Sequence, residues 1–488
     1  MELEPVIGLE IHVQLKTKSK MFCSCANMFP AAAGPRQQAV VADVPPNSAI
    51  CPICLGYPGT LPVPNRQAIE WTQLAGAALN CELATKSKFD RKSYFYPDLP
   101  KGYQISQYDQ PFCGKGELLG VGITRIHLEE DAAKNVHPEG ANYTLIDFNR
   151  AGTPLMEIVT EPDIRSPQQA KEFLQEIQRI MRALKISDAD MEKGQLRCDA
   201  NISLREKGSS ELHPKTEVKN INSFRFVEKA LQYEINRQTR EWEETGPPQQ
   251  QSTRGFNAAK GETYEQRTKE AAADYRYFPE PDIPPFQFSA SELEQRRLDV
   301  PELPHQRRQR LQEQFNLTPE LASAFAEKIE LAGFFEQVGS EVRQLINDRE
   351  ELTSADEQAL LKQAANLITR HLGGEKVNIS PANCAELVVL IHLGAVNKSS
   401  LAQVLAEMQR TGGDPDHIIQ NLGLAQVSGA DELTQVVEEV IAGNPDIVAK
   451  IKAGKEAAIQ ALVGQVMAKT RGTANPAIVL ELLKKHLD

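Results

Sequence analysis

Two segments of the chain alternate strictly between apolar and polar residues, which is the pattern of a strand with one buried face. They run from Leu9 to Leu15 (LEIHVQL) and from Arg197 to Arg205 (RCDANISLR). A helix is predicted between them, because Ser166 suits the N-cap and Pro167 suits the first turn. Its apolar face comprises Ala170, Phe173, Leu174, Ile177, Ile180, Met181 and Leu184. A second helix is expected from about Ser223 to Trp242.

Proline and glycine divide the rest of the chain. Residues 246–262 are rich in proline, glutamine and glycine and predict a loop or a weak hairpin. Pro279–Pro285 predicts a rigid extended segment, and a domain boundary is expected near residues 290–300. Helix signals dominate the remainder. Helix starts are predicted at Thr318-Pro319 and Ser380-Pro381, and a capping box at Ser354–Glu357 begins a helix that ends at Gly373-Gly374. A linker is predicted at Gly412–Pro415.

These patterns predict an α+β multi-domain fold. Mixed strand and helix is expected over residues 1–296, a helical domain over 297–412 and a small helical tail over 413–488. The 488-residue length and the 41% hydrophobic and 25% charged residues are typical of a soluble multi-domain protein. The longest apolar stretch, Leu387–Val396, is too short to span a membrane, and the acidic start has no leader pattern. We therefore expect a cytoplasmic protein, or one in an organelle stroma if a transit peptide was removed.

The net charge of −12 argues against nonspecific coating of nucleic acid, which depends on neutralising phosphates. It leaves room for a local basic patch.

Four of the eight cysteines are clustered in sequence, as Cys23-Ser-Cys25 and Cys51-Pro-Ile-Cys54. Two tight turns that each supply two thiolates suit a tetrahedral Zn²⁺. Four thiolates leave no open coordination position, so this site is predicted to be structural. Four free thiols are the alternative interpretation, and the C-x-C arm is tighter than the usual spacing.

Several carboxylates lie in strand-like segments. Glu10 and His12 leave the same face of one strand, about 6.6 Å apart at the backbone, which lets both reach one hard cation or a phosphate. Glu129 and Glu130 end another strand-like stretch, and Glu157 lies inside an apolar run. A buried acid needs a cation, a donor or a proton, so a structural ion pair is the alternative to catalysis for Glu157. Ligands that are mainly oxygens favour Mg²⁺ over Zn²⁺.

The segment Phe89–Asp98 (FDRKSYFYPD) is dense in aromatic and cationic residues. Such a segment can hold an anionic ligand and stack a base, or it can be a loop packed onto the core by its aromatic rings. The chain contains no G-x-x-x-x-G-K-[ST], so any use of ATP would not involve a P-loop. It also contains neither an amidase-type Gly/Ser-rich nucleophile segment nor a G-x-C-x-G turn, which argues against a glutaminase on this chain.

Long ordered motifs across almost the whole chain resemble the GatB family of tRNA-dependent amidotransferase subunits. They are VIGLEIHVQL (6–15), FDRKSYFYPD (89–98), YQISQ (103–107), LEED (128–131), GTPL (152–155), RCDANIS (197–203) and DYRYFPEPD (274–282). The terminal VGQVMAK (463–469) is similar to the YqeY-like tail of that family.

This resemblance implies a ligase that uses ATP to phosphorylate the side-chain carboxylate of Glu-tRNA(Gln) or Asp-tRNA(Asn), with both substrates left open. Ammonia from a glutaminase partner then displaces phosphate. The implied partners are the GatA amidase and the small GatC, in a heterotrimer, and the implied cradle is residues 1–296, with tRNA held by the helical regions.

The resemblance also assigns residues. It implies a Mg²⁺ site at Glu10, His12, Glu130 and Glu157, with Glu130 preferred to Glu129 on the family pattern, because strand alternation does not decide between them. Lys92 would steady phosphate or the developing acyl phosphate, and Arg91 and Tyr94 would join it at ATP. Structural Zn²⁺ at the four cysteines rests mainly on their spacing, since only part of the family has them.

Two other function classes fit parts of the sequence. An ATP-dependent amide ligase acting on a free small acid would use the same acidic metal site but gives no role to the helical remainder. A zinc-stapled RNA-binding scaffold explains the cysteines and the tail but leaves Glu10, His12 and Glu157 without a purpose.

Overall fold

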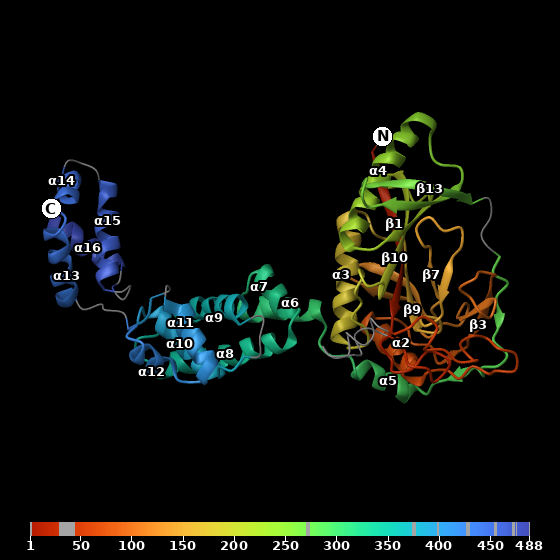
Figure 1. Cartoon of the computed structure of the whole chain (residues 1–488), viewed down its shortest axis with the longest axis horizontal. Helices are drawn as coiled ribbons and strands as arrows, with labels where there is room; N and C mark the ends of the chain where they lie inside the picture. The colour runs from red at the N-terminus through yellow and green to blue at the C-terminus, as the bar shows by residue number, and fades with distance from the viewer. Residues whose placement is uncertain are drawn as a thin grey trace. The chain divides into compact units, whose positions relative to one another are not determined.

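The alternating segment near the start of the chain, except its last residue Leu15, lies within strand β1, Leu3–Gln14, at the centre of the largest sheet (Figure 1). The computed structural model describes residues 2–28, 44–269, 274–372, 377–397, 400–425, 430–452, 456–470, 474 and 476–487. The chain divides into two compact units, Met1–Pro304 and His305–Asp488. Among the described residues, no helix is both long and apolar enough to cross a membrane.

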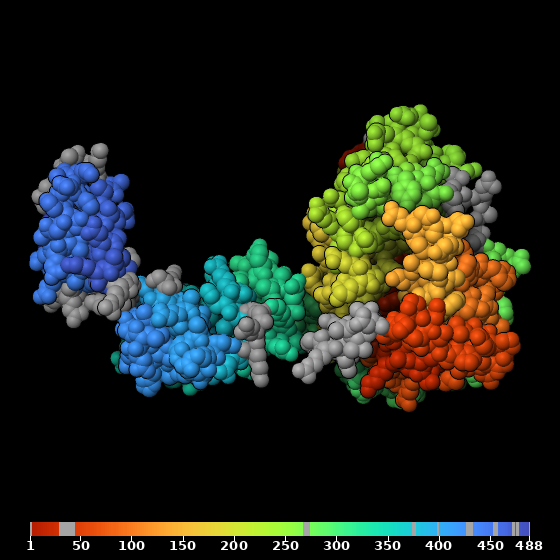
Figure 2. Space-filling view, in the orientation of Figure 1, coloured from red at the N-terminus to blue at the C-terminus, as the bar shows by residue number. Residues whose placement is uncertain are grey.

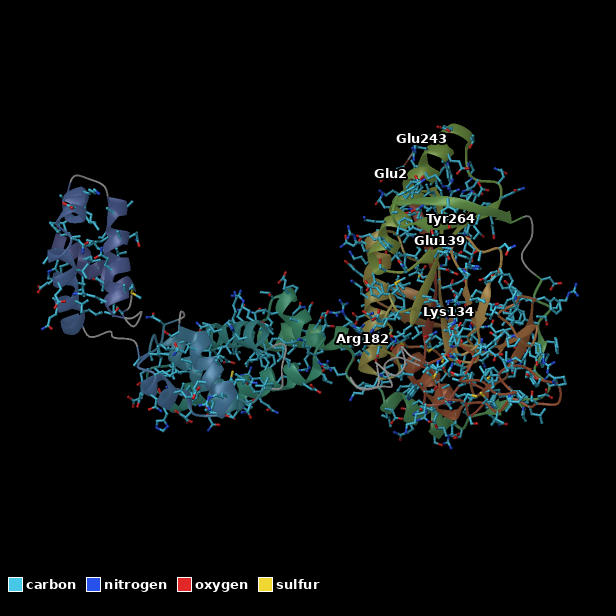
Figure 3. All side chains as sticks on the ribbon, viewed as in Figure 1. Glu2, Lys134, Glu139, Arg182, Glu243 and Tyr264 are labelled. Atoms are coloured by element: carbon cyan, nitrogen blue, oxygen red, sulfur yellow. The ribbon has the colours of Figure 1, made fainter. Side chains whose placement is uncertain are left out.

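The first unit mixes strands and helices. Its helices are α2 (Arg66–Ala78), α3 (Pro167–Ala183), α4 (Phe224–Thr245) and α5 (Ala290–Leu298). Its other strands are β2 (Lys86–Ser87), β3 (Asp90–Ser93), β4 (Tyr103–Ser106), β5 (Gly116–Leu118), β6 (Val121–Glu130), β7 (Lys134–Val136), β8 (Leu145–Asp147), β9 (Pro154–Thr160), β10 (Leu196–Glu206), β11 (Thr216–Ile221), β12 (Gln251–Asn257), β13 (Glu262–Lys269), β14 (Phe278–Pro279) and β15 (Phe286–Gln287). The labels of Figure 3 help to locate α3 (Arg182), β7 (Lys134) and β13 (Tyr264).

Eight strands form one sheet in the order β13-β12-β11-β10-β1-β9-β6-β5. β1 pairs antiparallel with β10 on one side and with β9 on the other, and β9 pairs antiparallel with β6. Ile11 therefore lies opposite both Cys198 and Ile158. The two strands predicted from alternation, within β1 and β10, are confirmed.

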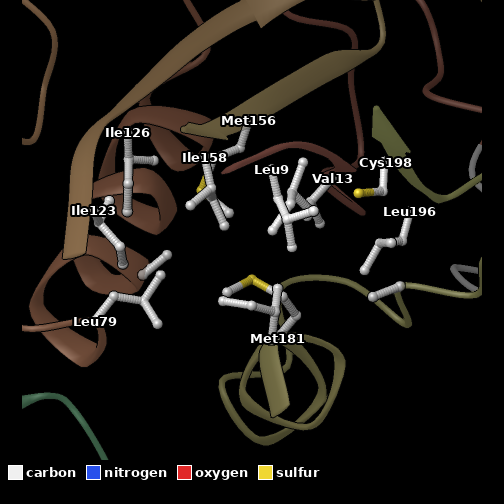
Figure 4. Close-up of a cluster of buried hydrophobic side chains, with 14 of the residues drawn as sticks. Leu9, Val13, Leu79, Ile123, Ile126, Met156, Ile158, Met181, Leu196 and Cys198 are labelled. Atoms are coloured by element: carbon white, nitrogen blue, oxygen red, sulfur yellow. The ribbon is translucent and has the colours of Figure 1, made fainter. Parts of the chain in front are cut away.

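Apolar side chains from one face of this sheet form the core of the unit. Leu9 and Val13 are buried there with Ile158 and with Met181 of α3, as Figure 4 shows, and Ile11 belongs to the same cluster. Each fully buried side chain of this size contributes about 1.5–3 kcal/mol by leaving water. Because successive side chains of a strand point to opposite faces, the intervening polar residues project from the other face.

The two helices predicted for this unit are present. Ser166 caps α3 by accepting from the Gln169 N–H at 3.1 Å, with Pro167 in the first turn. The predicted apolar face of α3 is buried throughout. Ser223 caps α4 in the same way, and that helix runs three residues beyond the predicted Trp242.

The segment interpreted as a loop or weak hairpin is a paired hairpin at one edge of the large sheet. β12 pairs antiparallel with β13 and parallel with β11. Thr263 of β13 contacts Glu234, which is fully buried on α4. The strand β11 and the helix α4, which contact this hairpin, are not part of the local sequence. The local proline and glutamine content therefore predicts the two strands only weakly.

Helices make up the second unit. They are α6 (Pro304–Phe315), α7 (Pro319–Ala326), α8 (Ile329–Asp348), α9 (Glu357–His371), α10 (Pro381–His392), α11 (Leu401–Thr411), α12 (Pro415–Asn421), α13 (Ala430–Ala442), α14 (Pro445–Lys452), α15 (Ile459–Lys469) and α16 (Pro476–Leu487). One apolar cluster joins residues 311–419, including Ile418 and Ile419 of α12, and another joins residues 433–487.

The predicted caps Thr318 and Ser380 are present. The capping box predicted at Ser354 and Glu357 is wrong by one residue, since the Thr353 N–H and hydroxyl donate to the Asp356 carboxylate at 2.9 and 2.7 Å. The predicted stop at Gly373-Gly374 lies outside the described residues. The predicted boundaries after residues 296 and 412 stay predictions.

We expect Gly76→Ala in α2 to destabilise the first unit by about 1–3 kcal/mol through overpacking. An added Cβ would lie 2.3 Å from the Cys113 Sγ and 3.0 Å from its Cβ. Chemical unfolding followed by circular dichroism measures the effect. Adding Cys113→Ala should restore at least half of the loss by making room, and a double variant no more stable than Gly76→Ala would contradict the packing argument.

Candidate functional site

Polar side chains from three neighbouring strands meet on the face of the sheet opposite the core. The pairing register places His12 of β1 and His127 of β6 on either side of Glu157 of β9. Both ring Nε2 atoms lie 3.2 Å from the Glu157 Oε2. A lone acid within an apolar strand is thus flanked by two imidazoles.

Glu129 completes this group, since it lies two residues after His127 on the same face of β6. Its Oε1 is 4.0 Å from the His12 Nε2, and its Oε2 is 3.6 Å from the His127 Nε2. The Ser106 hydroxyl of β4 donates to Oε2 at 2.9 Å. We call His12, His127, Glu129 and Glu157 the acid–histidine cluster. One ligand atom from each of His12, Glu129 and Glu157 lies within 4.8 Å of the others, a spacing that fits one cation.

Glu130 points to the opposite face of β6, so Glu129 and not Glu130 lies beside His12 and Glu157. The preference for Glu130 as the metal ligand stays a prediction from the family pattern. The Glu130 carboxylate accepts from the Ile105 N–H at 3.1 Å and pairs with Lys101. Both side chains line a cavity of about 220 Å³ that also touches Cys23 and Cys54. Adjacent strand residues face opposite ways, so Glu129 and Glu130 belong to different sites.

The charges of the acid–histidine cluster stabilise one another. Burial opposes ionisation of Glu157, yet His127 and His12 hold its pKa well below the usual range. Burial likewise opposes ionisation of Glu129, whose pKa is lowered by His127 and Lys92. Burial disfavours the imidazolium of His127, but Glu157 and Glu129 raise its pKa to about 9. The two carboxylates are therefore kept as anions, the form that binds a metal ion.

Lys92 of β3 faces this cluster. Burial would lower its pKa, but the charges of Glu129 and Glu157 raise it. The ammonium lies 4.9 Å from the ring centroid of Tyr275 and 6.0 Å from that of Tyr94. Burial raises the pKa of the Tyr94 phenol, which keeps it neutral. The structure thus brings a cation and two aromatic rings to the acids, as expected for a site that handles an anion.

Glu10 lies on the same strand face as His12 but outside the three close ligand atoms. The Asn201 amide of β10 donates to its Oε1 at 3.2 Å, while the Asn201 Oδ1 is buried without a hydrogen-bond partner among the described residues. Glu10 and Asn201 line a cavity of about 480 Å³, together with Val6, Gly8, Thr160, Ser203, His213 and Lys215. Figure 2 shows a hollow in the surface of this unit beside the β7–β8 hairpin (orange).

The four clustered cysteines come together as a cysteine quartet, Cys23, Cys25, Cys51 and Cys54, with all four Sγ atoms within 4.8 Å of one another. A tetrahedral zinc with Zn–S bonds of about 2.3 Å needs sulfurs about 3.8 Å apart, so the arrangement fits that ion. The Cys51 N–H donates to the Cys54 Sγ at 3.2 Å, and the fully buried Lys20 has its ammonium 3.9 Å from the same sulfur. The Cys23 thiol and these neighbours lower the pKa of Cys54 to about 5.

Two family models match separate parts of this chain. Residues 5–294 match the family model described as the GatB/GatE catalytic domain, and residues 359–487 match the one described as the GatB domain. A subunit of the aspartyl/glutamyl-tRNA(Asn/Gln) amidotransferase of Dehalococcoides mccartyi is 45% identical over 509 residues, covering 100% of this chain and 99% of that protein. The corresponding amidotransferase subunits of Persephonella marina and Thermomicrobium roseum are each 44% identical, over 500 and 497 residues.

The chain belongs to the GatB family. The relationship spans the whole chain, since the Persephonella protein and this chain are each covered completely. The resemblance inferred from the motifs is therefore confirmed, and so is the α+β fold with a helical carboxyl-terminal region.

Arg91 does not reach the acid–histidine cluster of this GatB-family chain. Its guanidinium binds both oxygens of Glu280 at 2.8 Å and Asp282 at 3.2 Å, and it lies 4.4 Å from the ring centroid of Tyr103. Arg91 and Lys92 are consecutive strand residues, so only one of them faces the cluster. Glu280 and Asp282 lie in the DYRYFPEPD motif, and their pairing with Arg91 explains part of that motif as structure.

Three residues of the site, His127, Arg197 and Lys219, were not predicted from the sequence. Arg197 lies opposite His12 in the β1–β10 register and pairs with the buried Asp131 at 2.6 Å. Lys219 of β11 pairs with Asp199 at 2.5 Å, on the same face of β10 as Arg197. Alternation within RCDANIS places Arg197, Asp199 and Asn201 on one face. This alternation identifies Arg197 as a residue of the site only when β10 is known to pair with β1.

Proposed function

We propose that this chain activates the side-chain carboxylate of Glu-tRNA(Gln), Asp-tRNA(Asn) or both with ATP and forms the amide with ammonia from a glutaminase partner. The observation that carries this proposal is the His12–Glu129–Glu157 group, which faces Lys92 and adjoins the cavity beside Glu10. The names of the relatives, amidotransferase subunits acting on these tRNAs, agree with it.

The reaction joins two anions, a carboxylate and a triphosphate. The carboxylate oxygen attacks the γ-phosphorus of ATP, the bond to the bridging oxygen breaks, and ADP leaves with an acyl phosphate as the other product. Ammonia then attacks the acyl carbon, phosphate leaves with the electrons of the C–O bond, and a proton is lost to give the amide. Both steps need charge neutralisation at the phosphate more than they need a nucleophile from the protein.

The residues present supply that neutralisation. His12, Glu129 and Glu157 would hold Mg²⁺, which when bound offsets phosphate charge. Lys92 would place an ammonium beside the transferring phosphoryl group, with the rings of Tyr94 and Tyr275 next to it. The Glu10 carboxylate and the Asn201 Oδ1, which has no hydrogen-bond partner among the described residues, offer acceptors to a nucleotide in the cavity of about 480 Å³, a volume suited to such a ligand.

Other parts of the chain have supporting roles in this proposal. The cysteine quartet would hold a structural Zn²⁺ that joins the turn at Cys23–Cys25 to the turn at Cys51–Cys54. The helical regions, 297–412 and 413–488, would bind tRNA, chiefly by its shape, since the chain carries a net charge of −12. We place the protein in the cytoplasm, in a complex with GatA and GatC.

ADP release by the complex of this chain with GatA and GatC tests the proposal. We expect release with Glu-tRNA(Gln) or Asp-tRNA(Asn) and none with uncharged tRNA, and conversion to the amide once glutamine is added. Release with free glutamate alone would instead indicate a ligase for a small acid. Binding of tRNA with no release under any condition would indicate a scaffold. His12→Ala, which removes one metal ligand, should bind tRNA as the unchanged chain does and release no ADP.

A further inference from the structure

His127 is the more deeply buried of the two histidines in the acid–histidine cluster. Its side chain is 5% exposed, compared with 21% for His12. Both imidazoles approach the same Glu157 oxygen at the same distance of 3.2 Å, so their surroundings and not their contacts with Glu157 distinguish them. His12 is open to a ligand and His127 is not.

We propose that His127 is a positioning residue that clamps one oxygen of Glu157 and one of Glu129, and so presents both carboxylates to the metal ion. This inference rests on the metal site of the proposed function. It assigns to His127 no contact with the ion, with ATP or with the aminoacyl group.

The two contacts of His127 are made through one ring atom. Its Nε2 lies 3.2 Å from the Glu157 Oε2 and 3.6 Å from the Glu129 Oε2. The Nδ1 is buried and has no hydrogen-bond partner among the described residues, so Nε2 is the atom through which the ring acts on its neighbours. The 3.6 Å contact with Glu129 is electrostatic more than a hydrogen bond.

Glu129 shows how such a clamp works. Its Oε2 receives the Ser106 hydroxyl at 2.9 Å and faces His127, while its Oε1 points toward His12. The Oε2 is thus held by Ser106 and His127, and the Oε1 stays on the side of His12, another candidate metal ligand. Glu157 is held from β6 by His127, across the strand pair that joins the two residues in register. Partners of this kind fix ligand geometry and typically change metal affinity about 10–100-fold when removed.

Manganese binding by the full-length chain, followed by electron paramagnetic resonance, tests the proposal. His127→Leu removes the donor but fills the buried position with an apolar side chain, and we expect Mn²⁺ affinity to fall about 10–100-fold. His127→Gln carries an amide nitrogen near the position of the ring Nε2, and we expect affinity within about threefold of the unchanged chain. His137→Leu, in the exposed segment after β7, is the matched control and should bind Mn²⁺ normally.

The magnesium dependence of ADP release by the GatA- and GatC-bound complex distinguishes positioning from a general loss of structure. For His127→Leu, we expect the Mg²⁺ concentration for half-maximal release to rise about tenfold or more, with most of the maximal rate recovered at high Mg²⁺. A role in packing alone predicts lower stability with an unchanged Mg²⁺ requirement.

Each outcome of the binding measurement has one meaning. Mn²⁺ affinity of His127→Leu equal to that of the unchanged chain overturns the inference. If the leucine variant does not fold, His127→Asn replaces it, because its shorter amide does not reach the Nε2 position; equal affinities of the Asn and Gln variants then overturn the inference. Failure of the unchanged chain itself to bind Mn²⁺ or Mg²⁺ would instead remove the metal site of the proposed function, on which the clamp depends.

Discussion

Glu129→Gln is expected to reduce tRNA-dependent ADP release by about 10³-fold or more, because it replaces a carboxylate that faces His12 and Glu157 with a neutral amide. Loss of a ligand from such a site removes several kcal/mol of charge stabilisation in the transition state, and each 1.4 kcal/mol is a factor of about ten in rate. The variant should bind tRNA with unchanged affinity, since Glu129 is buried at the floor of the site. Single-turnover ADP formation by the complex measures the first effect, and filter binding measures the second.

Glu130→Gln is the matched control, since the two residues are consecutive and chemically identical. It removes the charge that pairs with Lys101, on the other face of β6, so we expect a loss of stability. Mn²⁺ binding should nevertheless stay within about threefold of the unchanged chain, because none of the three close ligand atoms is altered. Loss of Mn²⁺ binding in Glu130→Gln, with normal binding in Glu129→Gln, would contradict the assignment and restore Glu130 as the ligand.

Glu129 and Glu130 show which part of the site can be predicted from the sequence alone. Alternation states that Glu129 and Glu130 face opposite sides of a strand, but it does not say which side carries the site. The answer depends on β9 lying between β1 and β6, so that His12 and His127 both meet Glu157. The pairing of β1 with β9 joins residues more than 100 positions apart, so a local sequence pattern does not predict it.

The elements themselves were predictable where local physics decides them. Alternation in LEIHVQL and RCDANISLR predicted two strands, and the cap Ser166 with Pro167 predicted the start of α3. The β12–β13 hairpin was underrated because its strands depend on pairing with β11 and on contacts with α4. Arg91 at the nucleotide is a prediction from the family resemblance, and the structure adds that Arg91 pairs with Glu280 and Asp282, which lie far away in sequence.

The cysteine quartet was predicted from spacing, and the fold gives it a mechanical role. The Met21 N–H donates to the Gly152 carbonyl at 2.6 Å, and the Lys20 ammonium donates to the Phe148 carbonyl at 3.3 Å. Residues 20–21 thereby tie the first cysteine turn to the turn that leads into β9. These contacts place the first cysteine turn beside the segment that precedes β9, the strand that carries Glu157.

Cys51→Ser with Cys54→Ser is therefore expected to release zinc and to lower the melting temperature of the first unit by about 5 °C or more. The second turn loses both of its sulfurs, and the buried Lys20 loses the thiolate that offsets its charge. Metal analysis should fall from about one zinc per chain to none, and differential scanning calorimetry measures the shift in melting.

Cys81→Ala is the matched control for this pair, because it removes a buried thiol of the same unit outside the quartet. It should keep the zinc, with a smaller shift in melting temperature from the lost packing. An unchanged metal content in the double serine variant would refute the zinc site. Loss of zinc with an unchanged melting temperature would confirm that the quartet binds the ion but would contradict a structural role for it. The turns at residues 23–25 and 51–54 would then hold together through their backbone contacts alone.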